Sequence, residues 1–183
     1  MSSDPLNELS FTVSGRIARP CAEVYEAVAD PAQLSRYFTT GGAQGRLDPD
    51  SVVTWDFADF PGAFPVTVVE ATPPHRIVIE WDGDQTTTPG GTTRTTFTFE
   101  PIDGDRRTLV TITEESWIAT HDGAKRAFGN CEGWTGMLIH LKARRNVPRT
   151  GHFQRLLHAQ MPGAQRSAVA HVVEQRAAAL RLA

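Results

Sequence analysis

Between residues 52 and 113 the chain alternates apolar and polar residues in short stretches, and this period of two constrains the fold more than any other feature. The apolar members are Val53, Trp55 and Phe57, Val66 and Val68, Ile77, Ile79 and Trp81, Phe97 and Phe99, and Val110 and Ile112. Turn residues such as proline and glycine separate the stretches. The pattern predicts an antiparallel meander with one apolar face and one wet face. We interpret the Thr- and Gly-rich residues 86–96 as a long hairpin tip.

Two short helices are expected before the meander. Residues 10–18 alternate and predict a first strand, and Pro20 then opens a segment whose apolar residues recur at helical spacing. Asp30-Pro31 ends this helix, because the residue before a proline avoids the helical conformation. A second short helix is expected from Pro31 to Phe38.

One long helix is expected after the meander, from Asp122 to about residue 146. Its apolar stripe consists of Cys131, Trp134, Leu138 and Leu141. Glycines at 129, 133 and 136 lower its helix propensity, so we expect the helix to lie tightly against the sheet there.

The length of 183 residues fits one domain with an extension. We expect a flexible N-terminus at 1–8, an α+β domain at 9–146 and a helical C-terminal extension at 147–183. Two amphipathic patterns in the extension, around Leu156 and around Val172, need a partner surface. We therefore expect the extension to dock on its own domain or on a second copy, and we favour a homodimer.

Charge is unevenly distributed along the chain. Residues 1–146 carry 13 basic and 20 acidic residues, a balance of −7, whereas residues 147–183 carry five arginines and one glutamate. An acidic body argues against nucleic acid or anionic lipid as the main partner.

The remaining composition points to a cytoplasmic protein. No apolar run approaches the ~18 residues that a membrane span needs, and the start has no pattern of a secretory signal. Two cysteines, Cys21 and Cys131, are too few for a disulfide scaffold, so we interpret both as free thiols.

Three motifs resemble one known family. They are the opening Ile17-x-x-Pro-x-x-x-Val-Tyr-x-x-Val-x-Asp-Pro-x-x-Leu-x-x-Tyr-Phe, the segment Glu70-Ala-Thr-Pro-Pro-His-Arg-Ile with Trp81, and Gly133-Trp-x-x-x-Leu-x-x-Leu. All three resemble the activator of Hsp90 ATPase homologue-like family. This family belongs to the Bet v1/START-like (SRPBCC) superfamily. Two departures are visible: residues 113–117 read Thr-Glu-Glu-Ser-Trp where many relatives have His-Ser-Gly-Phe, and the extension exceeds the usual length.

The resemblance implies a helix-grip fold, in which a curved antiparallel sheet wraps around the long C-terminal helix and two short helices follow the first strand. It also implies a cavity between sheet and helix that holds a hydrophobic or aromatic small molecule. The expected ligand-binding residues are Trp55, Phe57, Ile79, Trp81, Phe97, Phe99, Val110, Ile112, Glu114, Trp134 and Leu138. The alternative is that these apolar residues form only a filled core.

Two other functions stay open. The superfamily also contains enzymes of the aromatase/cyclase and hydrolase types, in which Glu114 with Tyr25 or a histidine would move protons. A chaperone-associated stress protein, implied by the family name, would need an exposed apolar patch on the sheet, and the outer faces read as polar. We assign no catalytic residue and expect no cofactor.

Glu114 is the strongest candidate for a functional polar residue. If the phase set by Val110 and Ile112 continues, its carboxylate points inward, where it must be paired, hydrogen-bonded or protonated. We favour the other interpretation, a strand end at which the carboxylate reaches water. Glu70 precedes a turn and is also expected to be solvated.

The remaining candidates predict no site. His75, His121 and His140 lack the spacing of metal ligands, and the other histidines are scattered in the extension. Asp82-Gly83-Asp84 is too short for a calcium loop and fits a hairpin turn. Cys21 and Cys131 have no nearby sequence partner that would activate a thiolate, so both are expected to be buried.

Overall fold

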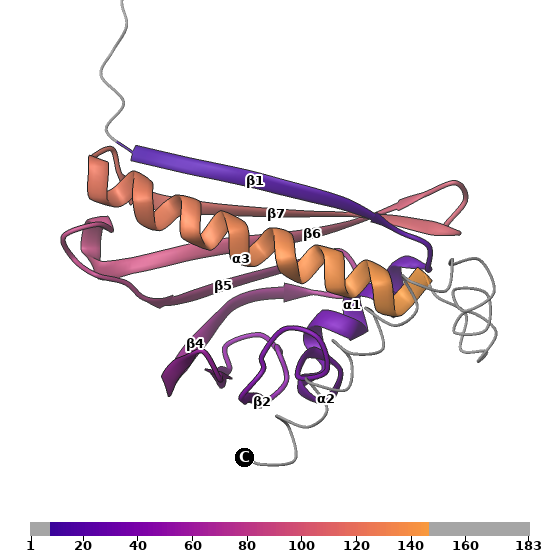
Figure 1. Ribbon diagram of the computed structural model, residues 1–183. Coiled ribbons are helices and arrows are strands. Elements are labelled where there is room, and N and C mark those ends of the chain that lie inside the picture. The colour runs from indigo at the N-terminus through magenta and orange to yellow at the C-terminus, as the bar shows by residue number, and fades with distance from the viewer. Residues whose placement is uncertain (1–7, 147–183) are drawn as a thin grey trace, which may run out of the picture. The chain divides into compact units, whose positions relative to one another are not determined.

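A computed structural model of the protein describes residues 8–146. The elements, in chain order, are β1 (Glu8–Ile17), α1 (Cys21–Ala29), α2 (Pro31–Leu34), β2 (Gly42–Gln44), β3 (Val52–Phe57), β4 (Phe60–Thr72), β5 (Arg76–Asp82), the 3-10 turn η1 (Pro89–Gly91), β6 (Thr92–Ile102), β7 (Arg107–Ile118) and α3 (His121–Asn146). Figure 1 shows the single long helix α3 running across one sheet, with α1 and α2 near its C-terminal end.

All strands join one antiparallel sheet in the order β1-β7-β6-β5-β4-β3-β2. The strands from β2 to β7 are neighbours in sequence and in space, as expected for hairpin-linked strands, and β1 pairs with the last strand. This is the α+β helix-grip architecture that the sequence predicts, with the two short helices after the first strand.

Interrupted pairing bends the sheet at several points. The register shifts between Leu9 and Phe11 on β1, between Trp55 and Phe57 on β3, and between Val68 and Glu70 on β4. A bulge leaves one residue unpaired, increases the local twist and bends the strand. The bulges therefore help the sheet to curl around α3.

Three expectations about the elements are wrong in detail. Strand β2 carries no clear alternation and was not expected. The predicted hairpin tip is shorter, because Thr92–Thr96 already form the start of β6, where the β-branched threonines suit a strand. The second helix ends at Leu34 instead of Phe38, and the turns that follow bring Phe38 against Trp55 and Trp134.

The short helices are fixed at their ends by aspartates. The backbone N–H of Cys21, at the start of α1, donates to Asp105 Oδ1 in the β6–β7 turn at 2.8 Å. Asp30 caps α2 by accepting from the N–H of Ala32 at 2.9 Å, with Pro31 at the first helical position. The contact with Asp105 thereby holds the start of α1 at the end of the sheet where β6 meets β7, whereas the Asp30 cap is local to α2.

The buried face of α3 is broader than the predicted stripe. Trp134, Leu138 and Leu141 are buried as expected, and Met137 and Ala127 are buried with them. Cys131 is only half-buried, so the expectation of a buried thiol is wrong there.

The helix glycines do not mediate close packing. A Cβ atom built on Gly129, Gly133 or Gly136 would meet nothing within 4 Å, so these positions face open space. The expectation that they allow α3 to lie tightly against the sheet is wrong, and the structure gives no other reason for them. The close approach occurs from the sheet side instead, where a Cβ on Gly15 of β1 would stand 3.8 Å from Leu138.

Several predictions concern the ends of the chain. The strand begins at Glu8, earlier than expected, and Glu8 accepts from the N–H of Ser116 at 2.8 Å. The expectations of a flexible N-terminus and of a helical extension at 147–183 concern residues outside those that the structure describes. Within residues 8–146, no helix is long and apolar enough to cross a membrane.

A chain ending at Asn146 is expected to fold, because every strand and helix of the fold is complete by that residue. Its urea melt should remain a single cooperative transition. An insoluble or molten product would contradict this and would show that the extension belongs to the core. Light scattering of the two chains tests the expected homodimer, because equal monomer masses for both would exclude it.

Candidate functional site

The Glu114 side chain is wholly buried inside the protein. Val110, Ile112 and Glu114 of β7 alternate with more exposed residues and are each 0% exposed, so the inward phase continues to the carboxylate. The expectation that Glu114 reaches water at a strand end is wrong, because β7 runs on to Ile118 and α3 covers this part of the sheet.

Four side chains donate hydrogen bonds to the Glu114 carboxylate. Oε1 accepts from Trp117 Nε1 at 3.0 Å and from Asn130 Nδ2 at 2.8 Å. Oε2 accepts from Trp134 Nε1 at 2.5 Å and from Thr95 Oγ1 at 3.1 Å. An ionised carboxylate offers about four lone-pair positions, so this carboxylate is fully used by the protein itself.

The pKa of Glu114 reflects two opposing effects. Burial raises the pKa above its usual value of 4.5, because a charged carboxylate loses its hydration in the interior. The hydrogen bonds from Trp134, Asn130, Thr95 and Trp117 favour the charged form and oppose that rise. The balance leaves the pKa raised.

A bulge in β7 brings Trp117 to the same interior as Glu114. Ser116 has φ = +74°, and on β1 only Ser10 separates the partners of Glu114 and Trp117. Trp117 therefore faces inward although it lies three positions after Glu114, an odd offset that would otherwise put it on the opposite face. Both residues lie in the segment Thr-Glu-Glu-Ser-Trp that departs from the family pattern. Asn130 and Trp134 are one helical turn apart on α3 and were recognisable as a pair on one face.

An aromatic cluster surrounds Trp134. Its ring lies 5.2 Å from Phe38, 5.4 Å from Phe97, 5.9 Å from Trp81 and 6.4 Å from Trp55, measured between centroids. These separations are typical of interacting aromatic side chains. The structure thus brings together four of the predicted ligand-binding residues and adds Phe38, which sequence reasoning missed.

The aromatic cluster continues toward solvent. Phe57 lies 5.1 Å from Phe38 and 6.0 Å from Phe64, and all three rings, like that of Trp81, are only partly buried. Phe64 was not among the predicted residues, although its place opposite Trp55 in the β3–β4 pair could have suggested it.

The other predicted residues are core positions. Ile79, Val110, Ile112, Phe99 and Leu138 are all buried. Phe99 packs against Tyr25 of α1, with 5.4 Å between ring centroids, and so contributes to the wall near α1.

One buried hydroxyl near the aromatic cluster has no partner. Thr93 stands opposite Trp81 in the β5–β6 pair and is buried, yet its Oγ1 makes no hydrogen bond within the described part of the chain. Thr93 and Thr95 are both buried on alternate positions of β6, so the unpaired hydroxyl lies on the same inner face as the Glu114 partner. An unpaired buried polar group is costly, and such groups in native proteins usually bind water or a ligand.

Among the described residues, the remaining candidates do not bond to Glu114. Glu114 bonds to neither Tyr25 nor a histidine within the described residues, and burial raises the pKa of Tyr25. Glu70 forms an ion pair with Arg76 at 3.0 Å across its hairpin and is half-exposed. No three residues among His, Cys, Asp and Glu gather as metal ligands in residues 8–146.

Cys21 behaves as a buried structural thiol. Its Sγ donates to the carbonyl oxygens of Pro74 and Phe99 at 3.2 and 3.3 Å. Burial raises the pKa of this thiol, which disfavours the reactive thiolate, as expected from sequence.

Two surface pockets lie away from the aromatic cluster. One, of about 380 Å³, is lined by Ser14, Gly15, Arg16, Ala18, Arg107 and Lys142. The other, of about 430 Å³, is lined by Ser35, Arg36, Tyr37, Thr40, His140, Ala143 and Arg144. Neither pocket includes a residue of the predicted ligand site.

Replacing Trp134 tests how far its ring and its N–H stabilise the fold. Trp134→Ala should lower the free energy of unfolding by roughly 3–5 kcal/mol, the range for large-to-small changes in a core. Trp134→Phe should keep the ring contacts but lose the donor to Glu114, at a cost of about 1–3 kcal/mol. Phe128→Ala is the control on the same helix, because Phe128 is 73% exposed. In urea melts, a loss below about 1 kcal/mol for Trp134→Ala would contradict the interior placement.

The raised pKa of Glu114 predicts a pH dependence of stability. Between the usual value of 4.5 and the raised value, the folded protein holds a proton that the unfolded chain has released. The free energy of unfolding should therefore fall as the pH rises through this window, and level off above it. Melts of the wild type and of Glu114→Gln from pH 4.5 upward measure the difference; a constant difference would show that the pKa is not raised.

Comparison with known proteins agrees with the geometry. A family model, described as activator of Hsp90 ATPase homolog 1-like protein, matches residues 18–145. No curated protein matches the chain.

Solved structures share the fold at low identity. Mll3558 from Rhizobium loti is 23% identical with a TM-score of 0.60, and the match covers 74% of this chain and 96% of that one. The Aha1 dimer from Colwellia psychrerythraea is 18% identical with a TM-score of 0.61, covering 78% and 99%. DynU16, a protein of the dynemicin biosynthetic locus, is 20% identical with a TM-score of 0.55, covering 77% and 49%. With its family model spanning well over half the sequence, the chain belongs to the activator of Hsp90 ATPase homologue 1-like family.

Proposed function

We propose that the protein binds a hydrophobic, aromatic small molecule between the sheet and α3. The observation that carries this proposal is the continuous aromatic cluster, which runs from the buried Trp134 to the partly exposed Phe57 and Phe64. Partly exposed rings can contact a ligand while the buried core residues keep their positions. Stacked or edge-on aromatic contacts favour a flat ligand. Binding sites for small molecules are mostly apolar with a few polar groups.

The inner end of this site supplies the polar groups. The unpaired Thr93 hydroxyl stands opposite Trp81 and is available to hydrogen-bond a polar atom of the ligand. Glu114 holds the Trp134 ring through its N–H and thereby shapes the wall of the site. The proposed ligand is therefore flat and largely apolar, with one hydroxyl or carbonyl group.

An enzyme is the second candidate, favoured by the raised pKa of Glu114 and by the relation to a protein of a biosynthetic locus. A proton-transfer role would require the substrate to reach a carboxylate whose positions are occupied by four donors. Ligand binding needs no such displacement, and we place it first.

The assembly and compartment belong to the same proposal. A relative of this fold forms a dimer in solution, which supports a homodimer here. The role of the extension 147–183 in that dimer is proposed from its amphipathic sequence patterns alone. The cytoplasm is the proposed location, on the basis of the unpaired cysteines Cys21 and Cys131.

Native mass spectrometry of the full chain, purified from its own host, should detect a retained small molecule. Calorimetry with 2-naphthol as a flat aromatic probe should then give measurable binding that quenches the fluorescence of the four tryptophans, since Trp55, Trp81, Trp117 and Trp134 all lie near the site. Phe57→Ala should weaken naphthol binding about tenfold through the lost ring contact.

Phe60→Ala is the matched control, because Phe60 pairs with Phe57 across the same hairpin but is 74% exposed. Equal weakening by both variants, or no retained molecule together with no naphthol binding, would contradict the proposed site.

A further inference from the structure

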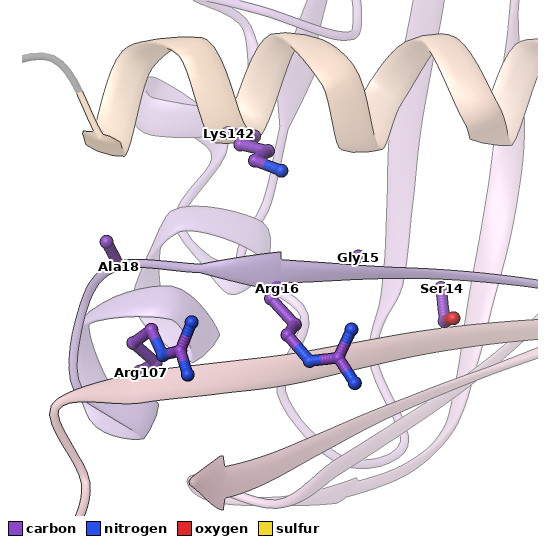
Figure 2. Close-up of a pocket in the computed structure, with 6 residues that line it drawn as sticks. All are labelled: Ser14, Gly15, Arg16, Ala18, Arg107 and Lys142. Carbon is purple, nitrogen blue, oxygen red and sulfur yellow. The ribbon is translucent and has the colours of Figure 1, made fainter. Parts of the chain in front are cut away.

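The pocket beside β1 gathers cationic side chains from three separate elements. Arg16 comes from β1, Arg107 from the start of β7 and Lys142 from the last turns of α3. Figure 2 shows both arginines on one side of β1, while Lys142 reaches toward β1 from the helix on the other side. The pocket therefore surrounds the edge strand of the sheet.

Strand register places the two arginines together, and helix packing holds Lys142 on the other side of the edge strand. Arg16 pairs with Leu109, so Arg107 lies two residues further along β7, on the same outer face as Arg16. Such diagonal neighbours on adjacent strands are ~7–8 Å apart, within reach of two arginine side chains. Lys142 follows the buried Leu141, and Leu138 one turn earlier lies where a Cβ on Gly15 would touch it, so this part of α3 packs against β1 beside the pocket.

Positive charge in this pocket is only partly neutralised. Arg107 is paired with Asp103, whose backbone oxygen also accepts from Arg106 Nε at 3.0 Å. Among the described residues, neither Arg16 nor Lys142 forms an ion pair with a carboxylate. The nearby Asp105 is engaged with the backbone of α1. The surroundings of Asp103 lower the pKa of its carboxyl, first through the hydrogen bond from Arg107 and then through the charges of Arg107, Arg106 and Arg16.

This local excess contrasts with the acidic domain around it. Residues 1–146 carry seven more acidic than basic residues, yet three cationic side chains line this pocket and only Arg107 is paired with a carboxylate. A cluster of cations that repel one another costs stability unless an anion binds, and arginine forks match phosphate oxygens with paired hydrogen bonds.

We propose that the pocket formed by Arg16, Arg107 and Lys142 binds the phosphate group of a small phosphate ester. The arginines donate to the phosphate oxygens from the outer face of the sheet, and the lysine ammonium adds a point charge from α3. This site is separate from the aromatic cluster and does not depend on the function proposed above.

Calorimetric titration of the full chain with inorganic pyrophosphate at low ionic strength tests the site. Arg16→Gln and Lys142→Gln should each weaken binding about tenfold, since each removes a charge-assisted contact. Arg76→Gln is the matched control, because Arg76 is a half-exposed arginine of β5 paired with Glu70, and the affinity of this variant for pyrophosphate should be unchanged. Equal loss in all three variants would indicate attraction by overall charge and would overturn the site.

A variant that is expected to bind pyrophosphate more tightly provides a further test. Asp103→Asn should tighten pyrophosphate binding roughly threefold, because it removes the carboxylate that competes for Arg107. Asparagine also tolerates the left-handed backbone of this turn, where Asp103 has φ = +54°. Unchanged or weaker binding in this variant would count against the proposal.

The source of the phosphate is distinguished by a second measurement. Cosedimentation with vesicles of phosphatidic acid and phosphatidylcholine should show no binding that depends on Arg16. Arg16-dependent vesicle binding without pyrophosphate binding would overturn the small-molecule source and assign the pocket to a lipid surface. If Arg16→Gln and Lys142→Gln leave pyrophosphate affinity unchanged, the anion binds elsewhere, for example on the arginines of the extension, and the proposal fails.

Discussion

The Glu114 carboxylate is the point at which the long helix is tied to the sheet. Its donors come from β6, β7 and α3, so one buried carboxylate links the last three elements of the fold. Removing one donor from this buried carboxylate should cost about 1–3 kcal/mol, more than most exposed ion pairs contribute. The apolar face of α3 supplies the buried apolar area. The hydrogen bonds to the carboxylate fix the rotation of the helix about its axis and its position along that axis. These hydrogen bonds also fix the position of the Trp134 ring, because its N–H must point at Glu114. The surrounding aromatic rings pack against the ring in that position.

The same arrangement limits the chemistry that Glu114 can perform. A general acid or base must contact the group whose proton it transfers, and this carboxylate has no exposed surface and no free acceptor position. A substrate could reach it only by displacing Trp134 or Asn130, which also hold the helix. Proton transfer would thus loosen the contact between α3 and the sheet, whereas a ligand that binds to Phe57, Phe64 and Trp81 leaves it intact. The raised pKa is explained by burial alone and needs no catalytic role.

Much of the fold could be predicted from local patterns, because alternation and helical spacing report which face of each element is buried. The alternation of Val110 and Ile112 allowed an inward Glu114, but the favoured expectation, a strand end at water, was wrong because β7 continues to Ile118. What failed depends on contacts between distant residues or on single backbone angles. The positive φ of Ser116 reverses the alternation and turns Trp117 inward, and a composition rich in threonine and glycine hid the start of β6. The donors to Glu114 come from residues up to 20 positions away, and no local pattern indicates that they meet.

The two proposed sites lie at different points along α3 and can be perturbed independently. Lys142 is eight residues beyond Trp134, which corresponds to about 12 Å along a helix. The aromatic cluster lies on the inner face of the sheet near β3, β4 and β5, whereas Arg16 and Arg107 lie on the outer face at the β1 edge. Surface charges separated by more than about 8–10 Å are largely screened at physiological salt, so substitution of Arg16 should not alter the aromatic site through its field. A coupling between the two sites would have to pass through movement of α3 itself. Because Glu114 fixes that helix, the strength of such coupling would report directly on how firmly the carboxylate holds it.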